Sequence, residues 1–301
     1  MTRLVEVPVQ FDDRSFDQFA GGFAQAMSDG ERVLFDAHAA EWASPYGLVG
    51  LLAAGDAAGR GRAERPLLTV PTNADVARYW SRIGFFHEAA GLFEIHGRYP
   101  KSRPQPESDV LLPVTPVRAA EDVHEVVSRI QQQASAILAS EVGLDPKATM
   151  GFAMALSEAC QNIVEHAGTG GWVAVQSYHW RRRLARRVVV IAVADAGVGF
   201  RHSLEPGEAK RFGDRWGDAA ALEAALIQGV SRFRDPGRGQ GLKGIRNYLA
   251  RWEGKISIRS GTARISIVPP WDDDVALKDG LPLFPGSQVS ILIPEQSSGK
   301  P

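Results

Sequence analysis

The stretch Ala155–His166, ALSEACQNIVEH, decides how the second half of this chain is interpreted. Glu158, Asn162 and His166 are four residues apart, so each step turns about 40° around a helix and the three side chains share one stripe. Apolar residues beside this stripe are expected to pack on a sheet: Ala155, Ala159 and Ile163. Carboxylate and amide oxygens one turn apart suit Mg²⁺. Taken alone, however, a polar stripe of this kind is more often a solvated helix face.

Two glycine-rich segments follow. Asp195–Gly199 (DAGVG) comes directly after the apolar run Val188–Ala194, which places a carboxylate at the end of a strand, above a tight turn that glycine permits. Gly237–Leu242 (GRGQGL) leads into an expected helix, where free backbone N–H groups favour an anion. Each segment alone could be a plain turn or a flexible loop. A Rossmann site is disfavoured because no βαβ unit surrounds the glycines.

In this order and spacing, the three segments resemble the N, G1 and G2 boxes of the GHKL (Bergerat-fold, HATPase_c) superfamily. This superfamily includes histidine kinases, gyrase-type ATPases, MutL-type repair proteins and anti-sigma-factor kinases. The resemblance covers about Val110–Pro294 and includes Gly286–Val289 (GSQV), which looks like the family's final strand. It implies a domain that binds ATP together with Mg²⁺.

The resemblance implies individual roles for residues of the first two segments. Asn162 would coordinate Mg²⁺ at the phosphates, and Glu158 would be the general base that orients water or a substrate hydroxyl. Asp195 would accept a hydrogen bond from the adenine amino group, above a turn formed by Gly197 and Gly199.

The remaining roles concern the phosphates, the lid and the last strand. The third segment and its neighbours would contact the triphosphate: Arg238, Gly239, Gly241, Leu242 and Lys243. Residues Phe200–Pro236 would form a mobile lid, and Ser287 would lie near the adenine.

Apolar periodicity predicts an α/β protein of two domains, over residues 1–98 and 110–301, joined by a proline-rich linker at 99–109. The first domain alternates strands and helices: Leu4–Val9, Ser15–Ser28, Arg32–Phe35, Tyr46–Gly59, Pro66–Val70 and Asn73–Ile83. The second is expected to be a sandwich with helices on one face of a mixed, largely antiparallel sheet. Its predicted helices are Ala119–Glu141, Pro146–Ala167 and Leu242–Arg251. Its predicted strands are Val110–Pro116, Trp172–Trp180, Arg187–Ala194, Lys255–Arg259, Ala263–Val268 and Gln288–Ile293.

The first domain resembles a STAS (anti-sigma-antagonist) domain over about residues 4–95. The resemblance rests on Val33–Asp36, Ala43–Leu48 and Pro66–Val70 with the helices that follow. STAS domains carry an Asp-Ser-[Ser/Thr]-Gly phosphoacceptor motif, whereas the stretch here is Ser44–Gly47 (SPYG), with proline at the acceptor position. This departure disfavours a phosphorylation switch, and Ser44 is expected to be a helix N-cap. A partner-binding or regulatory role is what the resemblance leaves.

Composition narrows the class of protein. The chain has 301 residues, a formal net charge of −1 and one cysteine, Cys160, so neither a bias toward nucleic acid nor an internal disulfide is expected. The absence of a signal-peptide pattern and of a long apolar run predicts a soluble, cytoplasmic protein with no membrane partner. Arg181–Arg187 is interpreted as a solvated hairpin tip, with a contact for nucleic acid or an acidic protein as the alternative. Asp272–Asp274 is interpreted as a solvated loop.

Within the superfamily, the spacing of Glu158, Asn162 and His166 looks most like the anti-sigma-factor kinase branch. The first hypothesis is therefore an enzyme that hydrolyses ATP or phosphorylates a Ser or Thr of a regulatory protein partner. The alternative is a nucleotide-gated interaction module with little or no catalysis. A homodimer is compatible with this branch, although no residue pattern identifies an interface.

Overall fold

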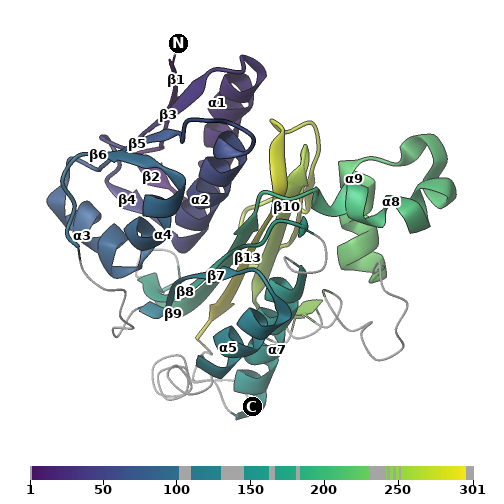
Figure 1. Ribbon diagram of the computed structural model, residues 1–301. Coiled ribbons are helices and arrows are strands. Elements are labelled where there is room, and N and C mark those ends of the chain that lie inside the picture. The colour runs from purple at the N-terminus through teal and green to yellow at the C-terminus, as the bar shows by residue number, and fades with distance from the viewer. Residues whose placement is uncertain are drawn as a thin grey trace.

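The computed structural model describes residues 2–101, 110–129, 146–162, 167–180, 184–230, 242, 245–246, 249–250 and 252–295. Residues 2–101 form an N-terminal layer around a four-stranded parallel sheet, with the order β1-β3-β5-β6 (Figure 1). Its strands are β1 (Thr2–Glu6), β3 (Arg32–Asp36), β5 (Leu67–Thr69) and β6 (Glu94–His96). Its helices are α1 (Phe16–Ser28), α2 (Pro45–Gly59), α3 (Ala74–Arg82) and α4 (Phe85–Leu92). The predicted strand–helix alternation is confirmed, while α4, β6 and the short parallel pair β2 (Gln10–Phe11) and β4 (Trp42–Ala43) were not predicted.

The described residues from 110 onward form a C-terminal layer around a seven-stranded sheet, with the order β12-β11-β10-β13-β9-β8-β7. Its strands are β7 (Val110–Val117), β8 (Gly171–Trp180), β9 (Arg186–Asp195), β10 (Lys255–Gly261), β11 (Ala263–Ile267), β12 (Leu277–Lys278) and β13 (Phe284–Pro294). Its helices are α5 (Ala120–Arg129), α7 (Pro146–Asn162), α8 (Gly199–Phe212) and α9 (Asp218–Glu223), followed by a π-helical turn over Ala224–Gln228. Every pairing among these described strands is antiparallel, so the expected parallel component of a mixed sheet does not occur there.

One face of this sheet packs on the helices of its own layer. Side chains alternate between the two faces of a strand, and Val173 and Val175 of β8 lie on the same face as Ile191 of β9. Leu156, Ala159 and their neighbour Cys160 on α7 are buried in the same cluster. The prediction that α7 packs on the sheet is thereby confirmed at Ala159, whereas Ile163 lies outside the described residues.

The opposite face is covered by α2, which belongs to the N-terminal layer. Ala174 of β8 and Ala192 and Ala194 of β9 are fully buried in one cluster with the apolar side chains of α2. Figure 1 shows α2 lying between the two sheets, and it packs against β8, β9 and β13. The sequence predicted helices on only one face of this sheet. The packing of α2 on the opposite face corrects that prediction. The apolar run of β9 is explained by it, because a strand buried on both faces needs apolar residues on both.

The sequence of helix α2 allows the helix to be buried on nearly every side. Its N-cap is Ser44, whose Oγ accepts a hydrogen bond from the backbone N–H of Gly47 at 3.2 Å, and Pro45 follows as a favourable first helical residue. Twelve of its fifteen residues are buried. A Cβ added at Gly47 would lie 2.6 Å from the carbonyl oxygen of Phe11, and one added at Gly50 would lie 2.3 Å from the ring of Phe16. Its glycines therefore let neighbouring chain approach the helix closely.

Buried charges also join the two layers. The guanidinium of Arg259 on β10, 1% exposed, donates to Asp17 of α1 at 3.2 Å. Lys255, 2% exposed, forms ion pairs with Asp13 of the N-terminal layer and with Asp272 and Asp274. The expectation that Asp272–Asp274 is a solvated loop is therefore wrong for Asp272 and Asp274, since two buried cations draw them inward: Lys255 and Arg264.

The predicted domain boundaries remain a prediction, because most of the expected linker, residues 102–109, lies outside the described part of the chain. The predicted helices beginning at Ala119 and Pro146 are present, although their expected C-terminal parts, residues 130–141 and 163–166, lie outside it. Strands β8 and β9 pair as a hairpin as far as Trp180 and Arg186, whereas Arg181, Arg182 and Arg183 at its predicted tip lie outside the described residues. No helix in the described ranges is long and apolar enough to cross a membrane.

The close approach at Gly47 generates a stability prediction. Gly47→Ala should destabilise the fold by about 1–3 kcal/mol, because the new methyl group would overlap the backbone of Phe11. Urea unfolding followed by circular dichroism measures this change. Gly91→Ala on α4 is the matched control, since a Cβ there meets nothing within 4 Å, and it should be neutral or slightly stabilising. Equal effects of the two variants would contradict the packing described for α2.

Candidate functional site

The candidate site starts at the end of β9, where Asp195 lies buried. Its side chain is 1% exposed, and its Oδ1 accepts a hydrogen bond from the backbone N–H of Gly197 at 2.8 Å. Its Oδ2 accepts from the hydroxyl of Ser287 at 2.5 Å. The backbone N–H of Ser287 also donates to this carboxylate. A carboxylate offers about four acceptor positions, so these three bonds leave capacity for one further donor. A buried carboxylate with a spare acceptor position is the kind of group that can recognise an amino group on a planar base.

The two glycines after Asp195 are both required by the local backbone. A Cβ at Gly197 would lie 2.1 Å from the carbonyl oxygen of Ala167, which accepts a hydrogen bond from the backbone N–H of Val198. Gly199 has φ +73°, in the left-handed region, and opens α8. The predicted tight turn after β9 is therefore present. The backbone of Ala167, beyond the C-terminal end of α7, packs against it.

Strand β13 lies beside β9 and supplies further residues of the candidate site. Gln288 pairs with Ala194, which places Ser287 next to Asp195. Gly286 has φ +70°, and a Cβ on it would lie 2.2 Å from the carbonyl oxygen of Asp195. Sequence reasoning quoted Gly286 within the last-strand motif but assigned it no role. Its role is to let β13 approach the Asp195 backbone.

Ser260 of β10 is a further residue that the sequence did not indicate. Its hydroxyl donates to the carbonyl oxygen of Gly286 at 2.9 Å and accepts from the backbone N–H of Phe200 at 3.1 Å. It therefore ties β13 to the start of α8. A single serine in a β-strand carries no signal in the sequence that would have revealed this contact.

The electrostatics of Asp195 follow from its burial. Burial raises the pKa of Asp195 to about 6, while the hydrogen bonds from Ser287 and Gly197 and the positive charge of Arg60 act in the opposite direction. Asp195 is therefore mostly ionised at neutral pH and becomes protonated in mildly acidic solution.

The first predicted segment lies on α7. Glu158 is partly buried, and Asn162 is the last residue of the helix; the side chain of Asn162, like His166, lies outside the described part. Met150 and Met154, two turns and one turn before Glu158 on the same stripe, are 65% and 55% exposed. The stripe carrying Glu158 therefore turns away from the apolar core, as the spacing predicted.

The third predicted segment is only partly described. Arg238, Gly239, Gly241 and Lys243 lie outside the described residues, so their expected contacts stay predictions. Leu242 is 7% exposed and belongs to the sheet-facing core, together with Ile245 and Leu249. Since its side chain packs in the core, Leu242 could contact a nucleotide only through its backbone.

The expected lid segment contains two different kinds of structure. Helix α8 is mostly exposed, whereas Ala221 and Leu222 of α9 are fully buried in the sheet-facing core. The carboxylate of Asp218 accepts from the backbone N–H and the hydroxyl of Thr262, both at 2.8 Å, which fixes α9 to the β10–β11 hairpin. The expectation of one mobile lid over Phe200–Pro236 is therefore wrong for α9, because its side chains are part of the core.

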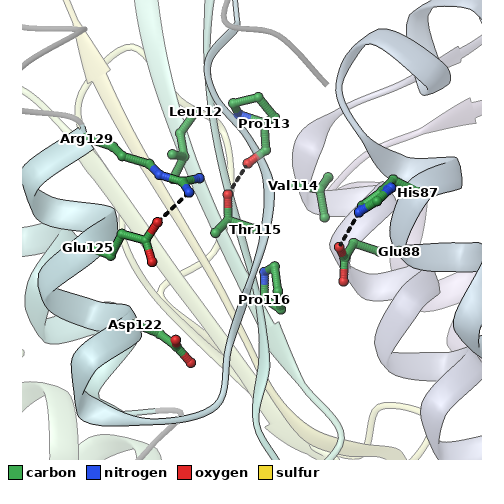
Figure 2. Close-up of a pocket in the computed structure, with 10 residues that line it drawn as sticks. All are labelled: His87, Glu88, Leu112, Pro113, Val114, Thr115, Pro116, Asp122, Glu125 and Arg129. Carbon is green, nitrogen blue, oxygen red and sulfur yellow. Dashed lines mark hydrogen bonds and ion pairs between the residues drawn. The ribbon is translucent and has the colours of Figure 1, made fainter. Parts of the chain in front are cut away.

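A separate cleft of about 440 Å³ lies where α4, β7 and α5 meet. Figure 2 shows His87 and Glu88 on one side and Asp122, Glu125 and Arg129 on the other. Its carboxylates are engaged within the protein: Glu88 with the indole of Trp172, Asp122 with two backbone N–H groups, and Glu125 with Arg129. None of its lining residues is a candidate from the three sequence segments. We therefore place the candidate site at Asp195 and not in this cleft.

A family model matches the part of the chain that contains the candidate residues Glu158 and Asp195. Residues 120–243 match the model of the histidine kinase-like ATPase domain, a range that contains α7, the end of β9 and the third glycine segment. No curated protein matches the chain. Residues 120–243 are therefore similar to the histidine kinase-like ATPase domain.

The pKa of Asp195 generates a testable pH dependence. Its folded value of about 6 lies above the ordinary value of 3.8, so the folded state binds this proton more tightly than the unfolded chain. The contribution of Asp195 to stability therefore grows as pH falls from above 6 to below 3.8, by at most about 3 kcal/mol. The free energy of unfolding, measured against pH for the wild type and Asp195→Asn, should show this growth in the difference between the two proteins. Parallel pH curves would contradict it.

Proposed function

We propose that this protein is an ATP-binding regulatory protein of the histidine kinase-like ATPase superfamily, and that it hydrolyses ATP or phosphorylates a Ser or Thr of a partner protein. One observation carries the proposal: Asp195 lies buried at the end of β9, inside the matched region. It is held by hydrogen bonds from Gly197 and from Ser287 of the neighbouring strand β13. In this proposal Asp195 accepts a hydrogen bond from the adenine amino group, and Gly197 and Gly199 shape the turn beneath the base.

The chemistry is proposed to reside on α7. Asn162 would hold Mg²⁺, which would neutralise charge on the phosphates, and Glu158 would orient the attacking water or hydroxyl as general base. The exposed stripe on which Glu158 lies supports this role, because a catalytic carboxylate must face the ligand and not the core. Arg238, Gly239, Gly241 and Lys243 would contact the phosphates.

The N-terminal layer is proposed to be a STAS-like unit that binds a regulator or substrate protein. Its parallel sheet with alternating helices and its helix α2, capped by Ser44, support this assignment. Ser44 is 7% exposed and its hydroxyl caps α2, so it is a poor phosphoacceptor. The layer would therefore act by binding and not by being phosphorylated. The anti-sigma-factor type and a cytoplasmic location belong to the same proposal.

A second candidate is a nucleotide-gated interaction module with negligible catalysis. The packing of the N-terminal layer on the sheet that carries Asp195 favours a link between nucleotide state and partner binding. Both candidates require ATP binding, so product formation separates them.

The proposed adenine contact predicts a loss of affinity in Asp195→Asn. A hydrogen bond to a charged group contributes about 1.5–3 kcal/mol, so calorimetric titration with Mg-ATP should show affinity reduced roughly tenfold to a hundredfold. Asp273→Asn, at a side chain that is 78% exposed, is the matched control and should bind as the wild type does. Wild-type affinity in Asp195→Asn would remove Asp195 from the site. No binding by the wild type would reject the proposed function.

The proposed general base predicts a separation of binding from turnover. Glu158→Ala should bind Mg-ATP nearly as tightly as the wild type while releasing ADP at least about a hundredfold more slowly. Calorimetry and an ADP-release assay on the same samples measure both quantities. Unchanged ADP release would exclude Glu158 as the base, and no release by a wild type that binds ATP would favour the gated module.

A further inference from the structure

The candidate nucleotide site receives a contact from outside its own layer. Arg60, at the C-terminal end of α2, donates from Nη1 to the carbonyl oxygen of Ala196 at 3.0 Å. Ala196 is 1% exposed and follows Asp195 directly, so the contact is made to the turn that shapes the site. The two residues are 136 positions apart in the chain.

The guanidinium of Arg60 is oriented from its own helix. Its Nη2 donates to the carboxylate of Asp56 at 2.6 Å, one helical turn earlier, and its backbone N–H donates to the carbonyl oxygen of Asp56. A guanidinium has donors in a fixed planar fork, so one arm held by Asp56 aims the other at Ala196. Because α2 is buried between the two sheets, the base of this fork is itself immobilised by packing.

The charges around Asp195 support an effect of Arg60 on the carboxylate as well as on the backbone. Among the described residues, Asp195 is faced by Arg60 from α2, by the hydroxyl and the backbone N–H of Ser287 from β13, and by the backbone N–H of Gly197. The positive charge of Arg60 opposes the rise in the pKa of Asp195 that burial causes. Asp56 faces Arg60 and moderates this charge.

We infer that Arg60 is a positioning residue of the nucleotide site, contributed by the N-terminal layer: it holds the Ala196 carbonyl and thereby the Asp195 turn in the conformation that accepts adenine. This inference rests on the proposed function. It means that Arg60, which lies outside the matched ATPase region, forms part of the site. Nucleotide affinity would then depend on how α2 packs between the two layers.

Calorimetric titration of the full chain with Mg-ATP, repeated between pH 5 and 8, tests the inference. Arg60→Ala should bind Mg-ATP about threefold to tenfold more weakly at pH 8, a modest loss because the Arg60 side chain is 47% exposed. The pH below which binding weakens should move upward, because Asp195 loses a stabilising charge. Arg60→Lys keeps the charge and should restore this pH midpoint without restoring the full affinity, since an ammonium lacks the planar fork.

Arg78→Ala is the matched control. Arg78 pairs with Asp75 on α3 much as Arg60 pairs with Asp56, at an exposed position of the same layer. This variant should bind Mg-ATP as the wild type does, with the same pH midpoint. Wild-type affinity and midpoint in Arg60→Ala would overturn the role of Arg60 while leaving the proposed function in place. A wild type that fails to bind Mg-ATP would overturn both.

Discussion

The burial of α2 between two sheets is the constraint on which the rest of the structure depends. A helix that is apolar on nearly every side must be covered on every side. The seven-stranded sheet covers α2 on one side, and the rest of the N-terminal layer, including α1 and α4, covers the other. The glycines of α2 let Phe11, Phe16 and Phe93 of the N-terminal layer approach the helix closely. The seven-stranded sheet is therefore held on one face by a helix from far away in the chain, and on the other by α7, which carries the proposed catalytic stripe.

The geometry of the candidate site follows from strand register. Asp195 and Ser287 meet because β9 and β13 pair with Ala194 opposite Gln288, and because Gly286 leaves room for the Asp195 backbone. A slip of one residue would turn each side chain to the opposite face of the sheet. The same antiparallel pairings that bury the apolar residues of β9 thus also place its terminal carboxylate, so the proposed adenine contact depends on the packing of the core.

Much of this arrangement was predictable from the sequence, because it depends on local periodicity. The helix carrying Glu158, the strand ending at Asp195, the tight turn at Gly197 and the N-cap at Ser44 all have signals within a few residues. The identity of the helix that covers the second sheet face, the contact from Arg60 to Ala196 and the burial of Asp272 have no local signal. They depend on residues that are distant in sequence and on buried cations whose partners only the tertiary structure identifies. The apolar run of β9 was the one hint that both faces are covered.

Ion pairs between the layers bear on how the chain folds. Arg259 and Asp17 are 242 positions apart, and the cover of α2 requires β8, β9 and β13. During synthesis the N-terminal strands and helices therefore emerge long before the strands that will cover them, and one apolar side of α2 stays in contact with water or with a chaperone until then. Contacts this distant also slow the search for the native state. The helix at the centre of the finished molecule is thus one whose apolar surface lacks its full cover while the molecule is being made.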